Sequence, residues 1–287
     1  MLSYFKLAYY LLRPRTVFLR RTSGALGDNL LLTAVLPAMR HKYPQHKIIV
    51  ETPWPELFRN NPYPDWVTDR HIKTTRRHIK PVYRVSGRGM PSLIAQMTAY
   101  VEPDPGALPE VYLDSREVKW ASQEYPGDYI AVCPTNPGDF CANRKEWGMA
   151  NFQALRDLLR EYSFVQVGLD GDPLLERAVD ARGLPVRRSA AVLHNSLFFL
   201  GLVGGLMHLA RAAGVRSAII YGGYEHPEIT AYEGNLSFGN DVDCSPCYDS
   251  HKMQEPCDTM KCMKGISPDS VCAEIRRELL DGLDRRG

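Results

Sequence analysis

The stretch FFLGLVGGLMHLARAAGVRSAIIYGG, residues 198–223, decides the fold class of this chain. It contains an apolar strand pattern, a glycine turn, an apolar helix pattern and a second strand pattern. The same order occurs near the start, where the strand pattern Thr16–Arg21 leads into TSGALGDN at 22–29 and then into an apolar helix. Helix N-termini at such turns present free N–H groups and the positive end of the helix dipole. Two such units predict two α/β halves with a cleft that binds a phosphorylated ligand.

Strand and helix patterns alternate through both halves, which predicts two domains built on parallel sheets. The first is placed at residues 1–125 and the second at residues 126–287. In the first, we expect a helix at 28–43 bent by Pro37, a strand at 47–51, a short helix at 92–100 and irregular segments at 70–90 and 102–109. In the second, we expect strands at 129–135 and 163–168, helices at 147–162 and 173–182, a cysteine-rich loop at 244–262 and a closing helix at 267–283 with Ser267 as its cap.

The composition limits the function classes. The chain has 287 residues, 44% of them hydrophobic and 24% charged, and a net charge of +2, so nothing in it favours nucleic-acid binding. No apolar run reaches the roughly 18 residues that span a bilayer. Seven cysteines, an odd number, occur without an export signal. This combination favours a reducing compartment, and we expect a cytoplasmic protein.

The first residues, MLSYFKLAYYLLRPR at 1–15, admit two interpretations. We favour a first helix or arm packed on the body of the protein. The alternative is a shallow peripheral anchor at the inner face of the membrane, with aromatic and leucine side chains inserted and Arg13 and Arg15 near the headgroups.

Five segments cover most of the chain outside residues 70–125. They are LRRTSGALGDNLLLTAVLPAMRHKYP (19–44), RNNPYPDWV (59–67), NRKEWGMANFQALRDLL (143–159), GLVGGLMHLARAAGV (201–215) and the tail DCSPCYDSHKMQEPCDTMKCMKGISPDSV (243–271). Their order and spacing resemble the glycosyltransferases of the lipopolysaccharide heptosyltransferase type. The resemblance implies a GT-B-like fold of two facing Rossmann-like domains. It also implies an inverting transferase that moves a heptose-like sugar from a nucleoside-diphosphate sugar to a glycan or glycolipid.

By this resemblance, Asp28 is the general base that takes the proton of the acceptor hydroxyl. The alternative from the residues alone is that Asp28 caps a helix beginning at Asn29. Gly24 and Gly27 lie on the acceptor side and permit close approach of a ligand to the backbone. They do not form a G-x-G-x-x-G fingerprint, although Glu51 at the end of the second strand keeps a dinucleotide interpretation open.

On the donor side, the resemblance places Lys145 or its neighbour Arg144 at the diphosphate, where a cation stabilises the departing group. The N–H groups of Gly204, Gly205 and Leu206 are expected to bind the same phosphates. His208 is either a phosphate donor or a packed helix residue. Asp170 is either near the nucleoside or in an ordinary turn. The segment YGGYEH at 221–226 is expected to line the cleft edge.

A basic run occupies the irregular part of the first half. It includes Arg76 and Arg77, together with His71, Lys73, His78, Lys80, Arg84 and Arg88. A charge run is usually a solvated face. In the resembling family this half faces the acceptor, so we expect an anionic glycan or glycolipid partner.

The second glycine turn departs from the family pattern, with Leu202, Val203, Gly204 and Leu206 where asparagine, an acid, a hydroxyl residue and proline are usual. This motivates a second hypothesis, a catalytically inactive relative that binds a sugar nucleotide or glycan. A nicotinamide-dependent Rossmann enzyme is a third, disfavoured by the missing fingerprint.

Four cysteines of the tail, Cys244, Cys247, Cys257 and Cys262, lie close together in sequence. They predict either a structural zinc or iron site, with His251 as a substitute ligand, or reduced thiols or two disulfides. No metal is expected at the reaction centre, because the chain has no clear D-x-D motif.

Overall fold

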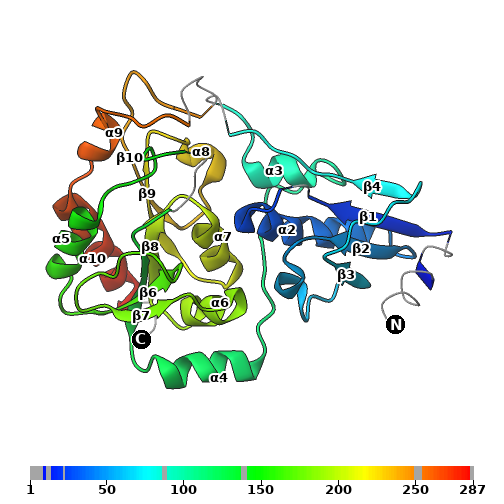
Figure 1. Ribbon diagram of the computed structural model, residues 1–287, viewed down its shortest axis with the longest axis horizontal. Coiled ribbons are helices and arrows are strands. Elements are labelled where there is room, and N and C mark those ends of the chain that lie inside the picture. The colour runs from blue at the N-terminus through cyan, green and yellow to red at the C-terminus, as the bar shows by residue number, and fades with distance from the viewer. Residues whose placement is uncertain are drawn as a thin grey trace. The chain divides into compact units, whose positions relative to one another are not determined.

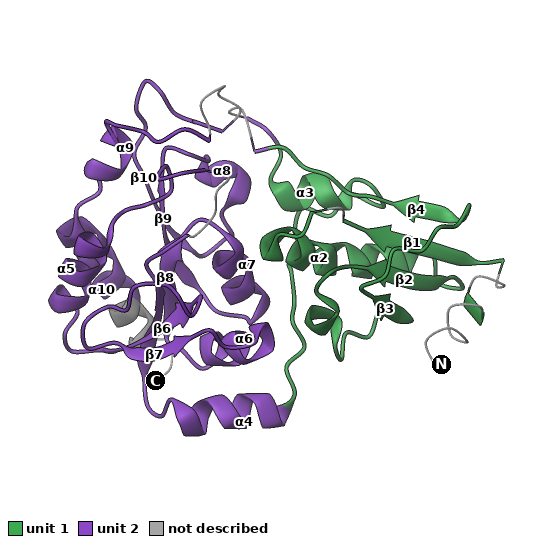
Figure 2. Cartoon of the chain, in the orientation of Figure 1, with its two compact units in different colours: residues 1–84, 91–114 green, residues 85–90, 115–287 purple. Residues whose placement is uncertain are grey.

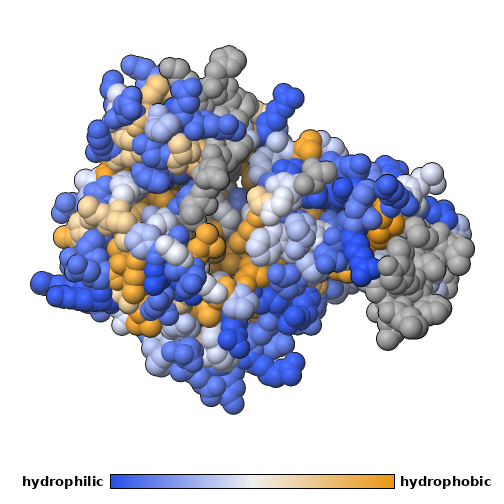
Figure 3. Space-filling view, viewed as in Figure 1, coloured by the Kyte–Doolittle hydropathy of each residue, from blue (hydrophilic) through white to orange (hydrophobic). Residues whose placement is uncertain are grey.

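The computed structural model describes residues 9–10, 14–21, 23–85, 89–136, 141–248 and 254–284 (Figure 1). The chain forms two compact units (Figure 2): residues 1–84 and 91–114 make unit 1, and residues 85–90 and 115–287 make unit 2. Hydrophilic residues cover much of the surface visible in Figure 3, as the composition predicts. Among the described residues, no helix has the length and apolar character needed to cross a membrane.

Unit 1 is built on a four-stranded parallel sheet in the order β3-β2-β1-β4. Its strands are β1 (Thr16–Arg20), β2 (Lys47–Glu51), β3 (Trp66–Thr68) and β4 (Arg77–Ile79), and its helices are α2 (Leu26–Lys42), η1 (Pro55–Phe58) and α3 (Leu93–Thr98). Helix α2 connects β1 to β2, which pair in parallel from Thr16 with Lys47 to Arg20 with Glu51. The predicted strands at 16–21 and 47–51 and the helix containing Pro37 are thus confirmed.

The face of this sheet that carries Phe18 and Ile49 packs against Ile72, Trp66 and Tyr10. The Tyr10 ring stacks on the Trp66 ring with centroids 5.8 Å apart, and its hydroxyl donates to the Asp65 carbonyl at 3.2 Å. This residue of the N-terminal segment therefore packs on the body of the protein. Residues 1–8 and 11–13, which carry most of the proposed membrane contact, lie outside the described residues.

Unit 2 is built on a six-stranded parallel sheet in the order β10-β9-β8-β5-β6-β7. Its strands are β5 (Tyr129–Cys133), β6 (Ser163–Gly168), β7 (Val179–Arg182), β8 (Phe198–Leu202), β9 (Ser217–Gly222) and β10 (Leu236–Gly239). Its helices are α4 (Ser115–Glu124), α5 (Met149–Leu158), α6 (Val186–His194), α7 (Gly205–Ala212), α8 (Pro227–Thr230), α9 (Lys261–Lys264) and α10 (Pro268–Asp284). The chain order of the strands reverses between β5 and β8. In doubly wound folds, ligands bind at this point beyond the carboxyl ends of the strands.

The sequence prediction is wrong in one element of unit 2. Residues 173–182 were expected to form a helix, but Val179–Arg182 is the edge strand β7, paired in parallel with β6. The buried Gln166 side chain fixes the preceding segment, because it donates to the Pro173 carbonyl at 2.8 Å and accepts from the Leu175 N–H at 2.8 Å. These bonds hold the chain in a non-helical path. Helices α4 and α6 and the short strand β4 were not predicted.

The chain passes between the units after residues 84, 90 and 114, whereas the sequence analysis set one domain boundary at 125–126. Helix α4 goes with unit 2 because it packs on α6. The contact includes an ion pair in which the Arg187 Nε donates to Glu117 Oε1 at 2.6 Å.

Candidate functional site

In unit 1, the candidate base Asp28 lies in the first turn of α2, just after β1. The helix begins at Leu26 with Ala25 at the N-cap position, and no side chain bonds to that cap. The alternative that Asp28 caps a helix beginning at Asn29 is therefore wrong. The carboxylate stands at the C-terminal edge of the sheet, where ligands of parallel sheets bind.

Two side chains fix the Asp28 carboxylate. Its Oδ1 lies 3.1 Å from the Arg21 Nη2 and accepts a hydrogen bond of 2.5 Å from the Tyr83 hydroxyl. The Arg21 guanidinium lies 4.7 Å from the centre of the Tyr83 ring, and its Nη1 donates to the Pro81 carbonyl at 2.8 Å. Asp28 and Arg21 are only 12% and 11% exposed. The carboxylate is thus held in one orientation by a cation and a hydroxyl donor.

Neighbouring side chains of unit 1 bond to the backbone of the turn that precedes Asp28. The Asn29 Nδ2 donates to the carbonyls of Ser23 at 3.0 Å and Ala25 at 2.8 Å, while its Oδ1 accepts from the Thr52 hydroxyl at 2.8 Å. The Trp54 Nε1 donates to the Gly24 carbonyl at 2.8 Å. A Cβ added at Gly24 would meet nothing within 4 Å, whereas Gly27 is buried in the helix. The turn is therefore rigid on its inner side and open at Gly24.

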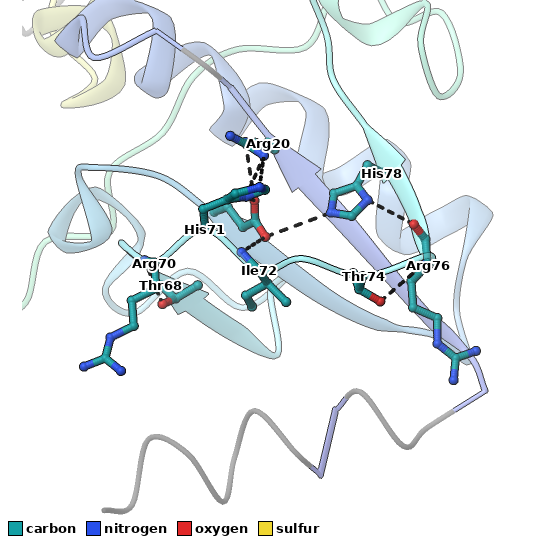
Figure 4. A network of polar contacts seen from close by, with 9 residues as sticks. Arg20, Thr68, Arg70, His71, Ile72, Thr74, Arg76 and His78 are labelled. Carbon is teal, nitrogen blue, oxygen red and sulfur yellow. Dashed lines mark hydrogen bonds and ion pairs between the residues drawn. The ribbon is translucent and has the colours of Figure 1, made fainter.

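A second polar cluster lies at the ends of β1 and β2, around the buried Glu51 (Figure 4). The Glu51 Oε1 accepts from the Ile72 N–H at 3.0 Å, and its Oε2 lies 3.4 Å from the Arg20 Nε and 3.3 Å from the His71 Nδ1. The His78 Nε2 lies 4.0 Å from this carboxylate. Glu51, the residue that kept a dinucleotide interpretation open, is thus occupied by partners of its own unit.

The structure does not bring Arg76 and Arg77 to Asp28. The Arg76 Nη1 donates at 3.1 Å to the carbonyl of Pro14, which precedes β1, and the Arg77 guanidinium lies 5.6 Å from the centre of the Tyr43 ring. Both arginines stand where β4 begins, whereas Asp28 follows the end of the parallel neighbour β1. The two groups are therefore at opposite edges of the sheet.

In unit 2, helix α7 begins at the switch point of the sheet. Gly204 is its N-cap residue, with no side-chain cap, and the first turn of α7 contains no acidic residue. The Asn136 Nδ2, which follows β5, donates to the Val203 carbonyl at 3.2 Å. A Cβ at Gly204 would lie 3.2 Å from the Asn136 Oδ1, so this close approach favours glycine here. The N–H groups of Gly205 and Leu206 begin an uncapped helix, the kind of place that binds anions.

Lys145 and Arg144 have different surroundings. The Lys145 ammonium pairs with the Glu225 carboxylate and lies 4.8 Å from the centre of the Tyr224 ring. Glu225 follows β9, the neighbour of the strand that leads into α7, so Lys145 stands at the same edge of the sheet as Gly204. The Arg144 Nε instead donates to the Glu255 carbonyl at 2.8 Å, which ties it to the cysteine-bearing segment. Of the two, Lys145 is therefore the better candidate for a donor contact.

His208 lies in α7, and Asp170 lies in the turn that follows β6. The His208 Nδ1 lies 2.6 Å from the Tyr232 hydroxyl, and the histidine is 7% exposed, which favours a packed role. Asp170 is in the exposed turn after β6, beside Gly183. The next acid, Asp172, is buried, and its Oδ2 accepts from the Leu169 N–H at 2.9 Å. Near it, burial raises the pKa of the Cys133 thiol to about 11.

Sequence reasoning did not single out Tyr83 or Asn136, and it included Glu225 only as part of the segment 221–226 expected to line the cleft edge. Each of them follows a strand of a parallel sheet, after β4, β5 and β9 respectively. A search for polar residues just beyond every predicted strand could have found Asn136 and Glu225. Tyr83 had no such signal, since β4 was not predicted.

The cysteines of the tail are free thiols, as are Cys133, Cys141 and Cys272, so the two-disulfide alternative is wrong. Within the part of the chain that the structure describes, no three histidine, cysteine or acidic side chains are grouped to hold a metal ion. A structural zinc or iron site at Cys244, Cys247, Cys257 and Cys262 stays a prediction. The candidate ligand His251 lies outside the described residues. Burial raises the pKa of Cys247, while the Met260 N–H lowers that of Cys257.

Comparisons with known proteins identify the fold. Neither a scan of protein-family models nor a search of curated proteins gives a match. Among solved structures, the iron-containing dodecameric glycosyltransferase TibC from enterotoxigenic E. coli is similar over 94% of this chain and 77% of its own, with a TM-score of 0.73 and 17% identity. The fold is that of the heptosyltransferases.

Two further solved structures have the same fold as this chain. A glycosyl transferase family 9 protein from Veillonella parvula has a TM-score of 0.74 and 15% identity, over 93% of this chain and 98% of its own. The ADP-heptose lps heptosyltransferase II of E. coli has a TM-score of 0.70 and 14% identity, over 92% and 99%. The predicted α/β class with two parallel sheets of GT-B type is confirmed.

Proposed function

We propose that this protein is an inverting glycosyltransferase that moves a sugar from a nucleoside-diphosphate sugar to a hydroxyl group of a glycan or glycolipid. The observation that carries the proposal is the Asp28 carboxylate, fixed by Arg21 and Tyr83 at the turn after β1. The heptosyltransferase fold supports the same reaction class.

In this mechanism Asp28 accepts the proton of the acceptor hydroxyl while that oxygen attacks the anomeric carbon. A positioned carboxylate contributes most when its orientation is set before the reaction. The bond between the anomeric carbon and the diphosphate breaks on the opposite side, so the anomeric configuration is inverted. Gly24 leaves room for the acceptor beside the turn.

The donor diphosphate binds at the start of α7, to the N–H groups of Gly204, Gly205 and Leu206, with Lys145 as the charged partner. Negative charge builds on the diphosphate as it departs, and the helix dipole and the ammonium stabilise that charge. His208 supports the helix through Tyr232, and Asp170 lies toward the nucleoside. No metal takes part at the reaction centre. Since one TibC structure is a complex with ADP-D-β-D-heptose, ADP-heptose is the first donor to test.

The acceptor is an anionic glycan or glycolipid of the kind found in lipopolysaccharide biosynthesis. The enzyme works in the cytoplasm, with Tyr10 of its N-terminal segment packed on the body of the protein. Contact of that segment with the inner face of the membrane is the alternative. Flotation of the protein with anionic vesicles, with and without residues 1–13, tests this contact.

Calorimetric titration with ADP, UDP, GDP and dTDP tests the proposal, followed by transfer assays with the matching donor sugars. We expect one nucleotide to bind and its sugar donor to be consumed only when acceptor is present. Absence of binding by all four nucleotides would contradict the proposal.

A second hypothesis is a catalytically inactive relative that binds a sugar nucleotide. It is favoured by the charge pairing at both candidate residues, because Arg21 neutralises Asp28 and Glu225 neutralises Lys145. Binding of a nucleotide sugar without transfer or hydrolysis would support this hypothesis over the first.

A further inference from the structure

We propose that Glu225 competes with the donor diphosphate for Lys145 and thereby sets donor affinity. The inference deepens the proposed function and rests on it. In the structure, the only charged partner shown for the Lys145 ammonium, among the described residues, is the Glu225 carboxylate. The two side chains are 11% and 10% exposed, so both charges are largely removed from water.

The Lys145–Glu225 pair lies at the edge of the sheet where a ligand is expected to bind. Glu225 follows β9, and Gly204 follows β8, which pairs directly with β9 in parallel. Both residues therefore lie beyond the carboxyl ends of neighbouring strands, the edge where ligands of doubly wound sheets bind. An anion seated on the start of α7 would lie at the same edge of the sheet as the Lys145–Glu225 pair, whose residues follow β5 and β9.

Electrostatics sets Glu225 and a diphosphate in competition for the charge of Lys145. A paired carboxylate cancels the charge of Lys145, and it repels a second anion brought to the same ammonium. In poorly hydrated surroundings this repulsion is screened less than at an open surface. Binding of a diphosphate to Lys145 must therefore include the cost of displacing Glu225.

The ring of Tyr224 keeps Lys145 in place when a diphosphate displaces Glu225. The ammonium lies over the ring of Tyr224, which is 1% exposed and packs against Cys141, Cys247 and Tyr248. Contact with the face of an aromatic ring stabilises a cation without neutralising it. The ring thus holds Lys145 in position while its charge becomes available to phosphate.

The test uses Glu225→Gln, which removes the charge but keeps the size and a hydrogen-bond acceptor. The matched control is Glu228→Gln, an identical charge change on the same segment at a side chain that is 65% exposed and 3.5 Å from His226. Calorimetry with inorganic pyrophosphate and with the nucleotide found in the screen measures affinity. Thermal unfolding of each variant checks that the protein is folded.

We expect Glu225→Gln to tighten binding of both probes about tenfold, within the 5–150-fold range typical of coupled sites. Glu228→Gln should change affinity by less than about twofold, since an exposed charge is screened by solvent. Lys145→Met should weaken binding, and Glu225→Gln should have no further effect in that background, because the coupling acts through Lys145.

The outcomes separate the two proposals. If the wild type binds a nucleotide and folded Glu225→Gln binds it no more tightly, the role of Glu225 is wrong while the proposed function stands. If Glu225→Gln tightens binding equally with and without Lys145, the carboxylate acts by general repulsion and the competition is likewise wrong. If neither the wild type nor Glu225→Gln binds any nucleotide, the proposed function itself fails.

Discussion

The strand–helix turns of the two units carry similar charge pairs with opposite roles. In unit 1 the candidate reactive group is a carboxylate, Asp28, and its partner is Arg21 over the ring of Tyr83. In unit 2 the candidate is an ammonium, Lys145, over the ring of Tyr224, and its partner is Glu225. The cation lies 4.7 Å from the ring centre in the first unit and 4.8 Å in the second.

The difference between the pairs lies in what holds the anion. Asp28 accepts a second bond from the Tyr83 hydroxyl, whereas the buried Tyr224 hydroxyl has no partner among the described residues. Arginine also offers a rigid planar fork, while lysine is a flexible point charge. We therefore expect the unit 1 pair to stay fixed and the unit 2 pair to exchange partners.

The first turns of helices α2 and α7 also differ in charge. Asp28 places a negative charge in the first turn of α2, but the first turn of α7 has no acidic residue. The positive end of α2 thus already has an anion, and that of α7 does not. This contrast supports the proposal that the base belongs to the first unit and the phosphate site to the second.

The largest expected effect comes from Asp28→Asn. If Asp28 is the base, transfer should fall by about 10²–10⁴-fold, the usual contribution of general-base catalysis. Nucleotide affinity should remain near that of the wild type, because the diphosphate binds in unit 2. Asp69→Asn, a matched change at an exposed aspartate of unit 1, is the control for transfer rates. Unaltered transfer by Asp28→Asn would remove Asp28 from the mechanism.

A second prediction compares the partners of the two pairs. Arg21→Met leaves the Asp28 carboxylate buried without a cation, and we expect a loss of roughly 3 kcal/mol in the free energy of unfolding measured with urea. Most of that loss should disappear in the double variant with Asp28→Asn, because no buried charge is then left unpaired. Additive losses in the double variant would show that the two residues do not stabilise one another.

The fold could be predicted from the sequence more fully than the site. The 198–223 unit was predicted correctly because parallel strands buried on both faces appear as continuous apolar runs next to a helical pattern. Residues 173–182 were predicted wrongly as a helix, because PLLERAVDAR is rich in helix formers. Only its pairing with β6 makes the end of this segment a strand.

The site depends on contacts that no local pattern contains. Tyr83 is 55 positions from Asp28, and Glu225 is 80 positions from Lys145. The resemblance to a known family pointed to Asp28 and Lys145, but their partners Tyr83 and Glu225 come from loops beyond other strands. Arg76 and Arg77 were predicted on the acceptor side because they belong to a basic run in the half that faces the acceptor in the resembling family. The structure places them at the other edge of the sheet, where strand β4 begins.

The smallest effect sharpens the comparison most, because it uses the same substitution in both units. Tyr83→Phe removes a hydroxyl that donates to a carboxylate, and a hydrogen bond to a charged group contributes about 1.5–3 kcal/mol to stability. Tyr224→Phe removes a buried hydroxyl without a partner among the described residues, so its effect should be close to zero or stabilising. Both variants keep the ring that the cation contacts, which isolates the hydroxyl. Urea unfolding of the two variants, measured side by side, gives the loss in the free energy of unfolding for each. Equal losses would mean that the Tyr83 hydroxyl does not stabilise the Asp28 carboxylate.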